Sequence, residues 1–104
     1  MKKDPEVALE VAKIFKLIKE ISPGKAVELR VPPYGAIQCG EGPIHRRGIP
    51  SNQVEMSADT FIQLAINPKS WAGLMGQGQI RASGHASDLS KLFTQVSAKY
   101  QAGI

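Results

Sequence analysis

The stretch DPEVALEVAKIFKLIKEISPGKAVELRV, residues 4–31, changes from the hydrophobic period of a helix to that of a strand. Asp4 is a favourable N-cap, Pro5 suits the first helical position, and Ser22-Pro23-Gly24 ends the helix. Between them, apolar residues recur every three or four positions, as Val7, Val11, Ile14, Phe15, Ile18 and Ile21. A helix over residues 4–21 is therefore predicted. Its apolar stripe must pack on another element, which we expect to be a sheet.

The end of the same stretch alternates between apolar and polar residues, which is typical of a half-buried strand. In residues 26–31, Val27, Leu29 and Val31 share one face, and Glu28 and Arg30 share the other. Similar patterns predict strands over residues 36–39, 53–56 and 79–83. The first two strands should be antiparallel, because only a short Pro- and Gly-rich turn joins them.

Three further helices are expected in the second half of the chain. Ser57 should cap one of them, and Ser70 should cap a second that ends at Gly76 and Gly78. Asp88 or Ser87 should cap the last helix. The resulting order, α-β-β-β-α-α-β-α, predicts an α+β fold with helices packed on one face of a mixed, mainly antiparallel sheet.

Composition limits the possible classes of function. The 104 residues suffice for one domain, residues 1–104, and the single cysteine excludes an internal disulfide framework. A net charge of +4 without basic clusters interleaved with aromatics argues against a nucleic-acid partner. No apolar run is long enough for a membrane span, and we expect a cytoplasmic protein.

Few residues have the spacing that catalysis or metal binding requires. Cys39 would need a base such as His45 to form a thiolate, so we favour a small buried thiol over a nucleophile. His45 and His85 lack metal-ligand spacing, so neither a metal nor a cofactor is expected. No carboxylate pair suggests general acid–base chemistry either.

A basic cluster is the alternative candidate. Arg46 and Arg47, next to His45, could join Arg81 to bind a carboxylate or phosphate, because guanidinium groups bind such anions in a bidentate way. A solvated basic loop is the simpler interpretation, and we prefer it.

Large apolar residues are concentrated in the last third of the chain. Trp71, Leu74 and Met75 lie in a short segment interrupted by glycines, and Leu92 and Phe93 lie in the last helix. The sequence alone favours a core role for them. A loosely packed helix over a sheet could also leave a ligand cavity.

Several motifs resemble those of a family of small bacterial proteins, the sterol carrier protein orthologues. They are RVPPYGAIQC (residues 30–39), GPIHRRG (residues 42–48), Val54-Glu55, residues 61–65, Trp71 and GQIRASG (residues 78–84). The likeness extends over roughly residues 26–98 and includes the general pattern of the type-2 sterol carrier protein.

This resemblance implies a sheet of about five strands, covered by helices that often enclose an apolar tunnel. It implies a non-enzymatic carrier of an apolar or amphipathic small molecule of the lipid, acyl or sterol kind. The ligand would contact Trp71, Leu74, Met75, Leu92 and Phe93, with a basic rim at Arg46, Arg47 and Arg81.

The resemblance also offers a second function. A similar module forms the C-terminal part of mycothiol-dependent maleylpyruvate isomerases, in which an arginine of the module assists the catalytic domain, and Arg81 lies in the matching stretch. The chain could thus be an accessory protein that lends a basic pocket to a separate thiol-dependent enzyme. The zinc-binding bundle of those enzymes has no counterpart here, so independent catalysis is not expected.

Overall fold

The computed structural model describes residues 3–42 and 52–103. Helix α1 (Pro5–Ile21) is followed by strands β1 (Val27–Val31), β2 (Gly35–Cys39) and β3 (Asn52–Met56). Helix α2 (Ala58–Ile66), a 3-10 turn (Pro68–Ser70) and helix α3 (Trp71–Gly76) lead to strand β4 (Ile80–Ser83) and helix α4 (Ser90–Gln101). The predicted element order is confirmed, with the 3-10 turn as an addition.

The sheet is mixed, with the order β2-β1-β3-β4. The central pair β1–β3 is parallel, and the edge strands β2 and β4 each run antiparallel to their neighbour. The expected count of about five strands is wrong: the described residues form four. The reason is visible in the sequence, since only four segments alternate in the way that a half-buried strand requires.

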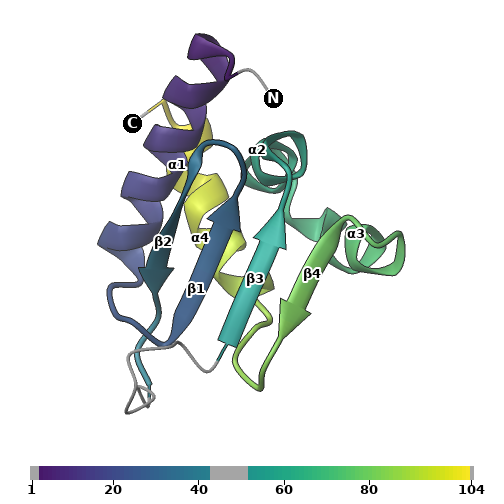
Figure 1. Cartoon of the computed structure of the whole chain (residues 1–104). Helices are drawn as coiled ribbons and strands as arrows, with labels where there is room; N and C mark the ends of the chain where they lie inside the picture. Colours follow the sequence, from purple (N-terminus) through teal and green to yellow (C-terminus); the bar gives the residue numbers. More distant parts are fainter. Residues whose placement is uncertain (1–2, 43–51, 104) are drawn as a thin grey trace.

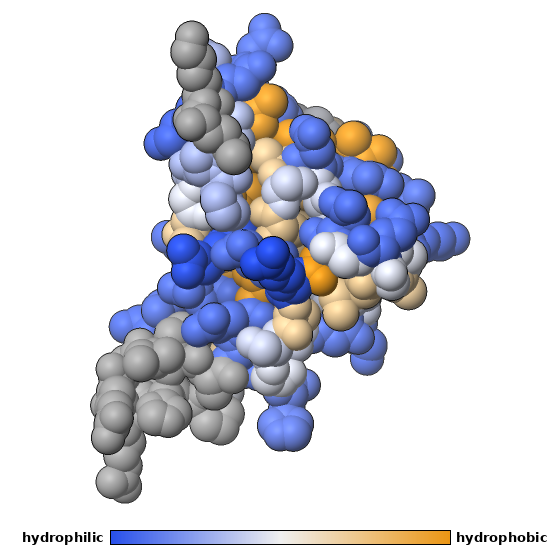
Figure 2. All heavy atoms as spheres, turned by 45° about the vertical axis from the view of Figure 1, so that its right-hand side comes forward, coloured by the Kyte–Doolittle hydropathy of each residue, from blue (hydrophilic) through white to orange (hydrophobic). Residues whose placement is uncertain are grey.

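One face of this sheet is covered by helices. Figure 1 shows α1 and α4 behind the strands, while α3 lies beside the β4 edge. Along β1, Val27, Leu29 and Val31 are buried, whereas Glu28 and Arg30 face the uncovered side, as predicted. The uncovered face is therefore polar, and blue residues dominate the surface in Figure 2.

The starts of α1 and α2 follow the predicted capping chemistry. The Asp4 carboxylate accepts hydrogen bonds from the backbone N–H groups of Glu6 and Val7, at 2.8 and 3.4 Å. The Ser57 hydroxyl accepts the Thr60 N–H at 3.2 Å and so caps α2. These bonds satisfy amides that have no partner within the helix.

Ser70 precedes α3 but does not cap it, because its hydroxyl donates to the Asn67 carbonyl at 2.6 Å. The prediction for α4 is also wrong: Leu89 holds the N-cap position without a side-chain bond, although Asp88, one residue earlier, accepts the Ser90 N–H at 2.9 Å.

Four aromatic rings join the helices beneath the sheet. Phe61 of α2 lies between Phe15 of α1 and Phe93 of α4, with ring centroids 5.2 and 5.8 Å apart. Phe93 also contacts Trp71 of α3 at 6.1 Å. Phe61 and Phe93 are fully buried. This chain of rings connects every α-helix of the described structure.

Two local constraints place the strands relative to the turns. Gly24 has a φ of +141°, and a Cβ there would lie 1.9 Å from the carbonyl oxygen of Gly40, so only glycine fits. Asn52 is buried at the start of β3, where its Nδ2 donates to the Ala26 carbonyl at 3.0 Å and its Oδ1 accepts the Ala86 N–H at 2.9 Å. Asn52 thereby ties β3 to the beginning of β1 and to the segment before α4.

The burial of α1 can be tested with Ile14→Asp. Ile14 is fully buried, so the substitution places an uncompensated carboxylate in the core and should lower the free energy of unfolding by about 3 kcal/mol or more. Ala12→Asp on the exposed side of α1 should change it by no more than about 0.5 kcal/mol. Urea unfolding of both variants measures the difference, and equal stability would show that α1 does not pack as described.

Candidate ligand-binding site

The predicted ligand residues occupy different environments. Trp71, Leu74 and Phe93 lie in the hydrophobic core, and Trp71 and Phe93 are in ring contact. Leu92 is half-buried, and Met75 is 38% exposed at the surface of α3. The structure thus brings Trp71 and Phe93 together, and a ligand would reach them only if α3 moved aside.

The predicted basic rim is only partly placed. Arg46 and Arg47, like His45, lie outside the described residues. Arg81 lies on the uncovered sheet face, in one cross-strand row with Arg30 and Glu55. The Glu55 carboxylate lies 3.7 Å from Nε of Arg30 and 4.0 Å from Nη1 of Arg81, and these residues line a groove of about 250 Å³. Arg81 therefore shares one carboxylate with a second arginine.

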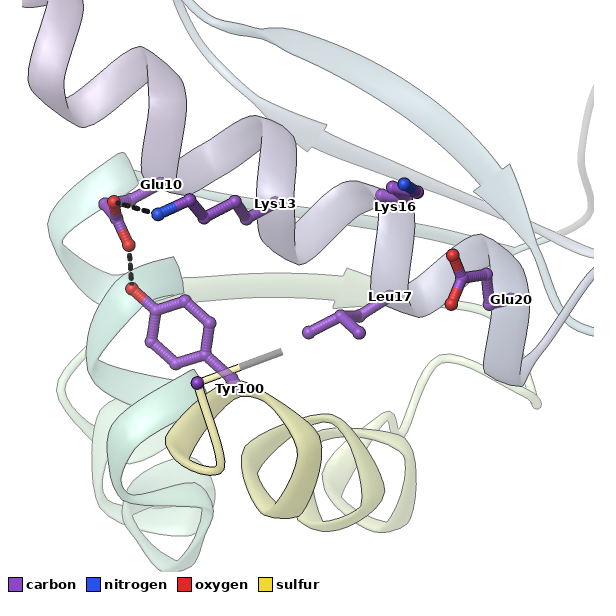
Figure 3. Close-up of a pocket in the computed structure, with 7 residues that line it drawn as sticks. Glu10, Lys13, Lys16, Leu17, Glu20 and Tyr100 are labelled. Atoms are coloured by element: carbon purple, nitrogen blue, oxygen red, sulfur yellow. Dashed lines mark hydrogen bonds and ion pairs between the residues drawn. The ribbon is translucent and has the colours of Figure 1, made fainter.

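Another hollow lies between α1 and α4, and we call it the α1–α4 groove. Its volume is about 460 Å³. Leu17 projects from α1 into the space that faces Tyr100 of α4, and Figure 3 shows charged side chains of α1 at both ends. The lining comprises Glu10, Lys13, Lys16, Leu17, Glu20 and Tyr100, together with Gly103.

One end of the α1–α4 groove is held by a small polar network. The Tyr100 hydroxyl donates to one oxygen of Glu10, and the Lys13 ammonium donates to the other at 3.2 Å. Both hydrogen bonds lower the pKa of Glu10, and the one from Tyr100 has the larger effect. Burial, followed by the hydrogen bond to Glu10, raises the pKa of Tyr100 to about 12. The carboxylate and the neutral phenol are thus the stable forms at neutral pH.

A second groove, of about 440 Å³, lies on the other side of α1, and we call it the α1–β2 groove. Phe15 and Ile37, both half-buried, provide its apolar lining. Lys16 and Glu20 belong to both grooves, so the outer ridge of α1 separates them.

The α1–α4 groove was not predicted from the sequence. The predicted stripe does not include Leu17, although Leu17 follows Ile14 by three positions, the spacing of one helix face. No sequence pattern connects Tyr100 with Glu10, because their hydrogen bond joins residues 90 positions apart in the chain. Helical spacing could have identified Leu17, whereas nothing local predicts that α1 and α4 lie side by side.

The prediction that Cys39 is a small buried thiol is confirmed. Cys39 is fully buried at the end of β2, and burial raises the pKa of its thiol to about 11. Within residues 3–42 and 52–103, no group of three or more His, Cys, Asp or Glu side chains could hold a metal ion. Nor is any helix in this part of the chain long and apolar enough to cross a membrane.

Comparison with known proteins assigns the family. Residues 4–94 match the family described as bacterial SCP ortholog, where SCP denotes sterol carrier protein. The chain belongs to this family. No curated protein matches the sequence.

Two solved structures are similar to this SCP ortholog. A UbiJ-SCP2 ubiquinone synthesis protein is 13% identical, with a TM-score of 0.50, and the match covers 95% of this chain and 80% of that one. Sterol carrier protein 2 from Yarrowia lipolytica, in its apo form, is 17% identical with a TM-score of 0.46, over 89% and 78% of the two chains. At these identities the first likeness establishes the sterol-carrier-like fold.

The burial of Cys39 gives a testable pH dependence. The thiol pKa is about 11 in the folded chain against 9.0 as the ordinary value, so its contribution to stability is complete below pH 9 and is lost as the pH rises toward 11. The full loss corresponds to about 3 kcal/mol. Urea unfolding between neutral and alkaline pH measures it.

Cys39→Ala provides the control, because it removes the titrating group while Tyr100 titrates in both proteins. The variant should lose less stability than the wild type over the same pH range. An identical loss in both proteins would mean that the thiol is not buried in the folded state.

Proposed function

We propose that this SCP ortholog binds an apolar or amphipathic small molecule and carries it without chemical change. The observation that carries the proposal is the α1–α4 groove, whose apolar centre around Leu17 lies between charged ends. Its volume of about 460 Å³ falls in the range of small-molecule sites, about 300–1,000 Å³. Family membership supports the same role.

The energetics allow useful affinity without a charged contact. Removing eight methylene groups from water contributes about 0.8 kcal/mol each, or roughly 6 kcal/mol before the costs of ordering the ligand. Micromolar binding of an acyl chain is therefore within reach of a groove of this kind. A salt-sensitive component would be added only by a charged head group.

The predicted region around Trp71 is the second location proposed for the ligand. Trp71 and Leu74 are each 7% exposed, so a chain could contact them only after α3 swings away from Phe93. The glycines of α3 favour such a movement, because glycine weakens a helix interior. The two locations therefore differ in whether α3 must open.

The accessory role for a thiol-dependent enzyme has less support. It would use Arg46, Arg47 and Arg81, and Arg81 lies near Glu55, which it shares with Arg30. No contact among residues 3–42 and 52–103 favours this role over ligand binding.

The proposal predicts direct binding of lipid-like molecules. Native mass spectrometry and calorimetric titration with a fatty acid, an acyl-CoA and a sterol should give a one-to-one complex with micromolar affinity in at least one class. The failure of all three classes to bind would refute the carrier function. Tryptophan emission serves as a second readout, since Trp71 is the only tryptophan.

Gly73→Ala distinguishes the two locations. An added Cβ at Gly73 meets nothing within 4 Å, so the substitution should stabilise α3 by about 0.5–1 kcal/mol. If the ligand occupies the α1–α4 groove, affinity and association rate should match the wild type, and Trp71 emission should change little. Slower association together with a large emission change would place the ligand beneath α3 instead.

A further inference from the structure

The lining of the α1–α4 groove is balanced in charge. Two carboxylates, Glu10 and Glu20, and two ammonium groups, Lys13 and Lys16, contribute to it, so the formal charges cancel. A rim of this kind gives no long-range attraction for an anion over a cation. It differs from a basic rim, which would select a carboxylate or phosphate.

The two ends of the groove differ in whether their charged side chains already have partners within the described chain. At the Tyr100 end, Glu10 already accepts hydrogen bonds from Tyr100 and Lys13. At the other end, Lys16 and Glu20 make no ion pair with any residue of the described chain. Lys16 offers only donors and Glu20 only acceptors. The free polar groups of the groove thus lie at one end and are of both kinds.

The space between these ends is apolar. Leu17 is 5% exposed and forms the centre of the groove, and the ring of Tyr100 faces it from α4. An aliphatic chain lying over Leu17 toward Tyr100 would place its polar end beside Lys16 and Glu20.

We infer that the α1–α4 groove selects a single-chain amphiphile whose uncharged head group both donates and accepts hydrogen bonds, a hydroxyl or an amide. Such a head accepts from Lys16 and donates to Glu20 at once. A carboxylate would be attracted by Lys16 but repelled by Glu20. An ammonium would be attracted by Glu20 but repelled by Lys16. This inference rests on the proposed function and adds the chemical class of the ligand.

Three ligands with the same chain and different heads test the inference: 1-decanol, decanoate and decylamine at neutral pH. Calorimetric titration should show decanol binding about two- to fivefold more tightly than either ion, the size of effect typical of exposed charge pairs. Decanol affinity should also be unchanged between low and high salt. A preference for decanoate that weakens with salt would overturn the inference while leaving the proposed function intact. No binding of any of the three would also overturn the inference, and the proposed function would fall with it only if acyl-CoA and sterols fail to bind as well.

Variants of the two free groups give the sharper test. Lys16→Gln should shift the preference between the two ions about two- to fivefold toward decylamine, and Glu20→Gln should shift it by a similar factor toward decanoate. Lys69→Gln and Asp59→Asn change the net charge equally at exposed positions outside the groove, so they should leave the ratio unaltered. An unchanged ratio in both groove variants, or equal shifts in the controls, would contradict the assignment.

Because Lys16 and Glu20 also line the α1–β2 groove, a separate readout must locate the ligand. Of the two grooves, only the α1–α4 groove is lined by Tyr100. Decanol should therefore shift the ring resonances of Tyr100 in an NMR titration. Shifts confined to Phe15 and Ile37 would assign the ligand to the other groove and overturn the proposed placement.

Discussion

The contact of Phe61 with Phe15 and Phe93 is the interaction on which the helix layer depends. The three rings come from α1, α2 and α4, and Trp71 extends the chain of rings to α3. Rings of this size dominate the burial of apolar surface, and tilted and edge-to-face pairs add a further contribution. With Phe61 and Phe93 fully buried, aromatic side chains occupy the layer between helices and sheet. Because aromatic rings fill this layer, the candidate ligand sites are the grooves on the outside of the helices.

The position of the α1–α4 groove follows from this packing. Ile14 and Ile18 bury the inner face of α1, while Leu17 turns toward α4 at the edge of that face. The bond from Tyr100 to Glu10 fixes the last turn of α4 against α1. The groove is thus bounded by two helices that are held together at one end and are further connected through Phe61 in the core. A ligand there would require little rearrangement of the core.

Much of the fold could be predicted because its determinants are local. The Asp4 cap, the stripe of α1 and the alternation of Val27, Leu29 and Val31 each specify an element within a few residues. The parallel β1–β3 pairing could not be predicted in this way, because alternation gives the faces of a strand but not its direction. Asn52 was missed for a similar reason, since its partners Ala26 and Ala86 are distant in the chain.

The candidate site was harder to predict than the fold. The sequence drew attention to Trp71 and Phe93 because they are large and apolar, and the structure places both in the core. The α1–α4 groove depends instead on Tyr100, which meets α1 only after the whole chain has folded. Family membership supports the proposed carrier function, but the lining of a groove is a property of the packed helices.

The central claim is that the ligand lies outside the aromatic core, in the α1–α4 groove. Intermolecular nuclear Overhauser effects in the complex with 1-decanol test it most directly. The account predicts contacts from the ligand methylenes to the Leu17 methyl groups and the Tyr100 ring, and none to the Phe93 or Trp71 rings. Strong contacts to Phe93 and Trp71 would contradict it and would place the ligand inside the helix layer.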